Sequence, residues 1–420
     1  MVEVLNGAVS SFHEIDLPVL LKQALDKHNF FIPTPIQTQV IPLALQGKDI
    51  LGSAQTGTGK TLAFAVPLVA KLLDEPNASS ALIIVPTREL AQQVTNEIRK
   101  ILSQNFLLKI ALLIGGEPIF KQLNQLQKKP RVVIGTPGRI IDHIERKTLM
   151  AHNVSTLVLD ETDHMFDMGF GIQIKEIMKY LPKIRQTLMF SATLPDDIVK
   201  LAEKYLNQPE RVFVEHEVTT STKIKQEIVY TTESEKYGKL ITQLSHRVGS
   251  IIIFVKTKQG ADQLAYKLGK DNYSALAIHG DLKQHKRERV INSFRRGCNQ
   301  IMVATNVASR GLDIPRTQHV INYDAPQSQV DYIHRIGRTA RAGAEGYALF
   351  FITPQDKRRL PALTDKKGEL NFDCNVKFKK LGSKKIFKKP SALKTKHGRK
   401  KINTFKGKSR ALEKVLPSIF

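Results

Sequence analysis

The sequence predicts two α/β domains in tandem, each built on a parallel sheet, followed by a basic C-terminal extension. The chain has 420 residues, which is enough for two or three domains. Short apolar runs rich in β-branched residues alternate with longer amphipathic stretches, a pattern typical of βαβ units, and this alternation occurs twice. Because 41% of the residues are hydrophobic and 25% are charged, the composition excludes wholesale disorder.

The apolar runs give the expected strands in chain order. For the first domain, residues 1–206, we expect strands at 49–52, 81–85, 110–114, 132–134, 157–159 and 187–190. For the second domain, residues 227–356, we expect strands at 251–255, 275–278, 301–304, 320–322 and 347–352. Residues 207–226 contain Asn207, Pro209 and a Thr/Ser cluster, so they are predicted to form the linker between the domains.

Positive charge is concentrated at the C-terminus. The chain carries 64 Lys and Arg against 39 Asp and Glu, and from Lys377 to Phe420 there are sixteen Lys and Arg against one acid, Glu413. Such a stretch is too polar to bury a core, so we expect residues 357–420 to form a disordered tail that binds nucleic acid. The alternative is a solvating tail that only keeps the protein soluble.

Several classes of protein are excluded by what the sequence lacks. The two cysteines, Cys298 and Cys374, are too few to form a disulfide framework for a chain of this length. No Cys/His cluster has metal-ligand spacing. The N-terminus has no basic stretch followed by an apolar one, and the apolar runs are far shorter than the ~20 residues that span a bilayer. We therefore expect a cytoplasmic protein that is neither exported nor embedded in a membrane.

Residues 54–61 form a candidate phosphate-binding loop between a predicted strand and a predicted helix at 62–73. Glycines allow a tight loop whose backbone N–H groups point at phosphate oxygens, Lys60 supplies a mobile cation, and the Thr61 hydroxyl can ligate Mg²⁺. The expected nucleotide contacts are Gln55, Thr56, Gly57, Thr58, Gly59, Lys60 and Thr61. The alternative is an ordinary Gly-rich turn, which the strand before the loop and the helix after it make the weaker interpretation.

A pair of adjacent carboxylates follows the predicted strand at 157–159. Phosphoryl transfer needs one acid to hold Mg²⁺ through its waters and another to orient and deprotonate an attacking water. We assign Asp160 to the first role and Glu161 to the second. An exposed acid pair in a loop is the alternative, and the apolar strand and the phosphate loop upstream argue against it.

The order of these motifs resembles that of the DEAD-box RNA helicases of helicase superfamily 2, over about residues 12–352. The motifs that carry the resemblance are Phe30 with 33–37, 54–61, 86–90, 115–116, 136–139, 160–163, 191–193, 254–257, 279–281 with Gln284 and Arg287, 305–313 and 334–341. The resemblance implies two RecA-like domains that close over one ATP, with ATP and Mg²⁺ as cofactors and RNA as the partner.

The resemblance also assigns nucleotide contacts outside the phosphate loop, namely Phe30, Gln37, Asn306 and Asp313. Gln37 would recognise the adenine edge while Phe30 stacks nearby. Two arginine fingers would come from the second domain. The expected catalytic residues are Lys60, Asp160, Glu161, Arg338 and Arg341. Taken alone, Gln37 would be a surface side chain in a turn, and the two arginines would be solvated ion-pair partners.

The RNA contacts implied by the resemblance are hydroxyls, glycine backbone amides and arginines. Such groups hold phosphates and sugars rather than base edges, so binding independent of sequence is expected. The positions are Thr87, Arg88, Gly116, Thr136, Arg139, Thr257, Gly280, Arg287 and Thr305. Ser191 and Thr193 would couple the acidic motif to the RNA surface; taken alone, they are a small hydroxyl pair in a tight turn.

Three positions depart from the family pattern, whereas Asp163 is kept. Thr162 replaces the usual Ala and adds a hydroxyl that must find a partner if it is buried. Asn306 replaces the usual Asp, and if this residue faces the ribose, Asn306→Asp would tighten ATP binding. Ala340 replaces the usual Gly between the two expected fingers. None of these changes removes a catalytic group.

These observations predict an ATP-dependent RNA helicase or remodelling enzyme. Its size and basic tail resemble those of bacterial members that act on structured or ribosomal RNA, and a monomer is expected. The alternatives are an ATP-switched RNA clamp that serves assembly and a DNA translocase built on the same two domains. The clamp would not unwind an RNA duplex with multiple turnover, and the translocase would be stimulated by DNA.

Overall fold

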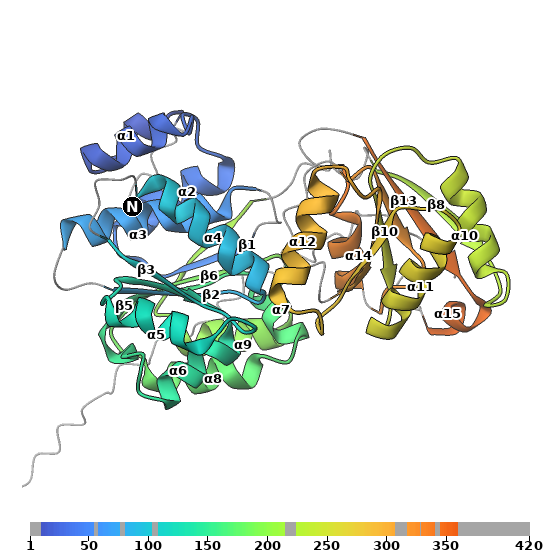
Figure 1. The fold of residues 1–420 in the computed structure, drawn as a ribbon. Helices are drawn as coiled ribbons and strands as arrows, with labels where there is room; N and C mark the ends of the chain where they lie inside the picture. Colours follow the sequence, from blue (N-terminus) through green and yellow to red (C-terminus); the bar gives the residue numbers. More distant parts are fainter. Residues whose placement is uncertain are drawn as a thin grey trace, which may run out of the picture. The chain divides into compact units, whose positions relative to one another are not determined.

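The computed structural model describes residues 10–53, 58–75, 80–102, 108–214, 224–306, 317–327, 329–340 and 345–359. Met1–Val376 group into one compact unit, and the described part of this unit contains two parallel sheets (Figure 1). The predicted tail lies outside the described residues from position 360 onward. None of the described helices is long and apolar enough to cross a bilayer.

The first sheet has seven parallel strands in the order β3-β4-β2-β5-β6-β1-β7. Parallel strands covered on both faces read as continuous apolar runs, and β4 is buried at every position. The strands are β1 Ile50–Ser53, β2 Ser80–Ile84, β3 Ile110–Leu113, β4 Val132–Gly135, β5 Val154–Leu159, β6 Gln186–Ser191 and β7 Glu210–Phe213.

Helices cover both faces of this sheet, and alternate residues of each strand enter the two cores. On one face lie η1 Phe12–Glu14, α1 Val19–Lys27, α2 Pro35–Leu45, α3 Lys60–Asp74 and α4 Arg88–Ile101 (Figure 1). On the other lie α5 Ile119–Gln127, α6 Pro137–Glu145, η2 Ala151–Asn153, α7 Thr162–Asp167, α8 Gly171–Tyr180 and α9 Asp196–Tyr205.

The second sheet has six parallel strands in the order β10-β11-β9-β12-β13-β8. They are β8 Ile224–Tyr230, β9 Ile251–Val255, β10 Ala275–Ile278, β11 Ile301–Thr305, β12 His319–Asn322 and β13 Gly346–Ile352. One face packs on α10 Lys236–Ser245 and α11 Lys258–Lys270, and the other on α12 Gln284–Arg295 and α14 Gln329–Ile336.

The prediction of two parallel-sheet α/β domains is confirmed, but the predicted linker at 207–226 is too long. β7 pairs with β1 in the first sheet, and β8 already begins at Ile224. Both are edge strands in which no run of residues is buried, so neither has the apolar pattern by which strands are recognised. At the other end, α15 Pro354–Arg359 extends beyond the predicted domain boundary at 356.

Candidate active site

The end of the phosphate loop is held by the first turn of α2. Gly59 has φ 91°, and a Cβ at this position would collide with the Gln37 amide, so glycine is required. Gln37 Nε2 donates to the Gly59 carbonyl (2.9 Å), and Thr34 Oγ1 donates to the Thr58 carbonyl (2.8 Å). Gln37 therefore supports the loop, a contact that the sequence did not predict. Residues 54–57 lie outside the described ranges.

The start of α2 explains why Gln37 points in this direction. Thr34 is the N-cap, and its backbone N–H donates to Gln37 Oε1 (2.8 Å), which completes one half of a capping box. Pro35 at the first helical position has the φ that a helix needs. Upstream, Phe30 is half-buried and packs against the core of the same domain.

Lys60 and Asp160 form a buried pair at the carboxyl ends of β1 and β5. Lys60 Nζ lies 3.7 Å from Asp160 Oδ1, and the side chains are 5% and 4% exposed. This distance is too long for a hydrogen bond, and among the described residues Nζ has no hydrogen-bond partner. A buried ammonium is costly without an acceptor. The pair therefore indicates a site for an anionic ligand.

Few residues could hold a metal ion here. Within the described ranges, no three His, Cys, Asp or Glu side chains gather to form a metal site. The Asp160 carboxylate and the Thr61 hydroxyl supply oxygen, the ligand type that Mg²⁺ prefers. Because Mg²⁺ commonly binds one or two carboxylates together with substrate phosphates, these residues fit an ion that arrives with a nucleotide.

Burial and neighbouring charges act differently on the two carboxylates. Burial raises the pKa of Asp160, and the Lys60 ammonium only partly opposes it. Burial also acts to raise the pKa of Glu161, but the hydrogen bond from His164 and the charges of Lys60 and Arg338 outweigh it, so this pKa is lowered. Glu161 is therefore ionised, the form that can accept a proton.

The rest of the acidic motif is tied to the loop after β6. Asp163 Oδ2 accepts from Thr193 N (2.8 Å) and Thr193 Oγ1 (2.9 Å). Ser191 Oγ accepts from Asp163 N (3.3 Å) and donates to the Thr193 carbonyl (2.6 Å). Thr162 is fully buried, and its hydroxyl donates to the Phe190 carbonyl (3.1 Å), so the additional hydroxyl has the partner that burial requires.

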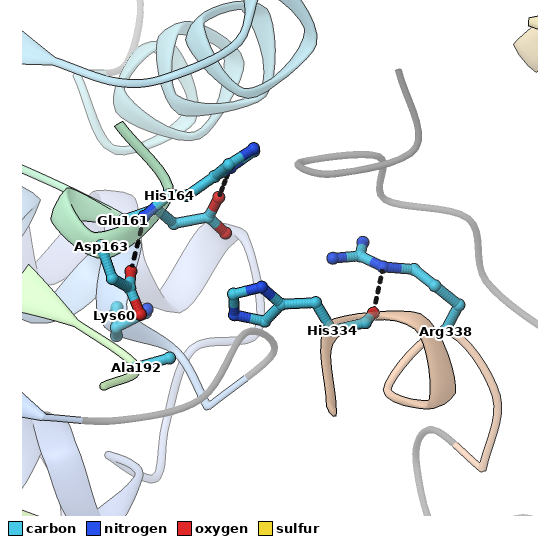
Figure 2. A pocket seen from close by; sticks show the side chains of 7 residues that line it. All are labelled: Lys60, Glu161, Asp163, His164, Ala192, His334 and Arg338. Carbon is cyan, nitrogen blue, oxygen red and sulfur yellow. Dashed lines mark hydrogen bonds and ion pairs between the residues drawn. The ribbon is translucent and has the colours of Figure 1, made fainter. Parts of the chain in front are cut away.

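A small cavity joins the acidic motif to residues of the second domain (Figure 2). Arg338 is buried, and its Nε donates to the His334 carbonyl (3.3 Å). The His334 ring centroid lies 6.4 Å from that of His164. The lining consists of Lys60, Glu161, Asp163, His164, Ala192, His334 and Arg338. Of the expected groups from the second domain, Arg341 and Asp313 lie outside the described residues.

Asn306 belongs to a polar network at the end of β11. Its Nδ2 donates to Asp331 Oδ2 (2.8 Å), which also accepts from Arg335 Nη2 (3.1 Å) and Gln327 N (3.2 Å). An Asp at position 306 would place a second carboxylate against Asp331, and like charges at this distance repel. An Asp at position 306 would therefore disturb this network, and its effect on ATP binding stays a prediction.

The expected RNA contacts follow neighbouring strands in each sheet. In the first domain, Thr87, Gly116 and Thr136 come after β2, β3 and β4, which lie side by side. In the second domain, the corresponding strands are β9, β10 and β11, also neighbours, and the residues at their ends are Thr257, Gly280 and Thr305. The carboxyl ends of parallel strands share one edge of a sheet, where ligands commonly bind.

Arginines gather at this edge of the first domain. Gly116 has φ 81°, and a Cβ there would collide with the Arg88 guanidinium, so Arg88 lies against this turn. Burial lowers the pKa of Arg88, and the nearby charges of Arg287 and Arg139 lower it further. Arg139 Nη1 donates to the Glu117 carbonyl (3.5 Å). Positive charges held this close together favour an anion between them.

Arg287, which the resemblance assigned to RNA contact, makes a buried ion pair with a residue of the first domain. Its Nε donates to Glu89 Oε1 (2.6 Å) and its Nη1 to the His279 carbonyl (3.0 Å), and the Arg287 and Glu89 side chains are each 7% exposed. The sequence pattern assigned no role to Glu89, because a Glu in the first turn of a helix is ordinary and its partner is 198 residues away. The same pattern did not single out His164 or His334.

Two family descriptions match the chain. Residues 34–201 match the DEAD/DEAH box helicase family, and residues 233–343 match the helicase conserved C-terminal domain. The DEAD-box ATP-dependent RNA helicase CshA of Geobacillus kaustophilus is 45% identical over 349 residues, which cover 83% of this chain and 74% of the relative. The Bacillus subtilis protein of the same name is 44% identical over 354 residues, or 84% and 72% of the two chains.

A solved structure supports the same assignment. S. cerevisiae Dbp5 bound to RNA and ADP BeF3 is 31% identical, with a TM-score of 0.73 over 83% of this chain and 90% of that chain. This similarity confirms the two RecA-like domains expected from the motifs. The chain belongs to the DEAD-box family of ATP-dependent RNA helicases.

Proposed function

We propose that this chain binds and hydrolyses ATP at the cavity around Lys60 and uses the cycle to unwind or remodel RNA locally. The observation that carries the proposal is the buried Lys60 ammonium, which lies beside Asp160 and lacks a hydrogen-bond partner within the described part of the chain. A nucleotide phosphate would supply that partner. The names of the bacterial relatives and the contents of the yeast structure support this choice of ligands.

The proposed chemistry assigns one role to each group around the cavity. Lys60 holds the outer phosphates, and Thr61 and Asp160 would hold Mg²⁺, which supplies charge neutralisation when bound. Glu161 orients the attacking water and takes its proton. Arg338 stabilises the charge that develops on the transferred phosphoryl group, and we propose the same role for Arg341.

Adenine recognition is proposed for Gln37 and Phe30. The Gln37 amide uses one N–H on the Gly59 carbonyl and one lone pair on the Thr34 N–H. A second N–H and a second lone pair remain for the adenine edge. Gln37 would then form hydrogen bonds with the adenine base and with the phosphate loop at the same time.

RNA is proposed to lie along the strand ends that present Thr87, Gly116 and Thr136 in the first domain, with Arg88 and Arg139 neutralising its phosphates. The hydrogen bonds of Asp163 with Ser191 and Thr193 would couple this surface to the acidic motif. We propose that Arg287 also contacts the RNA, beside its ion pair with Glu89. The counterparts in the second domain are Thr257, Gly280 and Thr305.

The finer assignments are proposed on sequence grounds. Structured or ribosomal RNA is the proposed target, the protein acts as a monomer, and the cytoplasm is its compartment.

The basic tail would anchor the enzyme by neutralising RNA phosphates. A variant that ends at Val376 should keep RNA-stimulated ATP turnover at saturating RNA but should need more RNA to reach it. If the full-length protein and the truncated variant bind RNA with equal affinity at two salt concentrations, the tail does not bind RNA and only keeps the protein soluble.

The experiment that tests the function is the unwinding of a short RNA duplex present in excess over enzyme, with ATP. Multiple turnovers are expected, together with ATP hydrolysis that RNA stimulates more than DNA of the same sequence. Retention of RNA without repeated unwinding would favour the RNA clamp. Equal stimulation by DNA would favour a translocase on DNA.

A further inference from the structure

Glu161 has a backbone conformation that is uncommon for a residue with a side chain. Its φ is 51° and its ψ is 50°, in the left-handed region, directly before α7. L-residues other than glycine, Asn and Asp rarely adopt this region. The direction of the carboxylate therefore depends on the contacts that hold this turn and not on regular helix geometry.

His164 makes the hydrogen bond that reaches the carboxylate. Its Nδ1 lies 3.2 Å from Glu161 Oε2, and the residue is 1% exposed. A dashed line marks this hydrogen bond in Figure 2. The His164 backbone N–H also donates to Asp163 Oδ1 (3.0 Å), which fixes the point from which the imidazole extends.

The hydrogen bond determines how the imidazole is protonated. A carboxylate that acts as a base has no proton of its own and can only accept a hydrogen bond, so in the proposed role of Glu161 the proton of this hydrogen bond is on Nδ1 of His164. Its Nε2 is buried and, counting the described residues alone, has no hydrogen-bond partner, and the ring lines the cavity with Glu161 and Arg338. The ring thus gives a donor to Glu161 and forms part of the cavity wall.

We propose that His164 is a positioning residue for Glu161, whose carboxylate it holds in the orientation that takes the proton from the attacking water. The inference rests on the proposed hydrolysis with Glu161 as general base. His164 does not touch the substrate and acts through the carboxylate. A substitution here should therefore affect kcat for ATP hydrolysis and leave ATP binding unchanged.

Three substitutions separate this role from simple packing. The amide nitrogen of His164→Asn can occupy the place of Nδ1, whereas that of His164→Gln falls near the place of Nε2, and His164→Phe fills the space with no donor. His164→Asn should keep most of the kcat for RNA-stimulated ATP hydrolysis. The Gln and Phe variants should lose roughly ten- to a hundredfold, as expected for a hydrogen bond to a charged group, with KM for ATP unchanged in all three.

A double substitution tests whether His164 acts through Glu161. In the Glu161→Gln background, His164→Phe should cause no further loss of kcat, because the group that it positions is already gone. Thermal unfolding of each variant monitors the fold. Equal kcat for the Asn and Gln variants, or additive losses in the double variant, would overturn the inference. Absence of RNA-stimulated hydrolysis in the wild type would instead contradict the proposed function.

Discussion

Two buried pairs of a cation and a carboxylate, one in each domain, differ in how many hydrogen bonds the cation makes. In the second domain, Arg335 Nη2 donates to Asp331 Oδ2 (3.1 Å), and its Nη1 donates to Asn322 Oδ1 (3.0 Å) and to the Asp324 carbonyl (2.6 Å). In the first domain, Lys60 lies 3.7 Å from its carboxylate and, among the described residues, makes no hydrogen bond.

The number of hydrogen bonds made by the cation distinguishes a pair that stabilises the fold from a pair that can bind an anionic ligand. A buried ion pair whose cation makes several hydrogen bonds, as Arg335 does, holds strands and helices in place, and removal of one partner leaves a costly unpaired charge. A buried cation with no hydrogen-bond acceptor already destabilises the protein when no ligand is bound. The Arg335 pair should therefore matter for the free energy of unfolding, and Lys60 should matter for ATP turnover.

The largest expected effect is on stability. Arg335→Met should lower the free energy of unfolding by about 3 to 5 kcal/mol, because Asp331 is left buried without its cation. Urea denaturation at neutral pH measures this change. Lys258→Met is the matched control, since Lys258 pairs with Asp281 and both are exposed, so no measurable change is expected. Equal effects of the two substitutions would show that burial does not distinguish these pairs.

The second effect is on catalysis. Lys60→Ala should reduce RNA-stimulated ATP turnover by about 10²- to 10³-fold, the cost of removing one group that stabilises transition-state charge. The free energy of unfolding should fall by less than in Arg335→Met, because Lys60 Nζ makes no hydrogen bond within the described residues and burial already raises the pKa of Asp160, which favours its neutral form once the cation is gone. A large loss of stability would mean that Lys60 is a structural residue like Arg335.

The smallest effect concerns the network around Asp331. Asn306→Asp should lower the free energy of unfolding by about 1 to 3 kcal/mol, because a donor to Asp331 is lost and a second carboxylate is placed beside it. ATP affinity and urea denaturation are measured together. The double variant Asn306→Asp/Asp331→Asn should recover part of the loss. Tighter ATP binding with unchanged stability would contradict this account of the network and would support the expectation that position 306 faces the ribose.

Much of the fold was predictable because several central strands are continuous apolar runs. β4 and β9 are buried at every position, so their sequences show continuous apolar runs. The edge strands β7 and β8 were missed because no run of residues in them is buried. Their place in the sheets depends on pairing with β1 and β13, which local pattern does not reveal.

The candidate site was predictable where its groups are consecutive in sequence. The adjacent Asp160 and Glu161 after an apolar strand could be recognised directly. The ion pair of Glu89 with Arg287 and the bond of Gln37 to the Gly59 carbonyl join segments far apart in the chain. No spacing rule predicts such contacts, because they depend on how helices and loops pack. The contact of His164 with Glu161 is local, but a lone His has many ordinary uses.

The measurement that tests the central claim most directly compares ATP hydrolysis and RNA retention in the wild type and in Glu161→Gln. The substitution preserves the shape of the side chain and removes the base. Turnover should fall by at least about 10²-fold, while ATP stays bound and labelled single-stranded RNA dissociates more slowly than from the wild type. Hydrolysis close to the wild-type rate would contradict the assignment of Glu161 and with it the proposed mechanism.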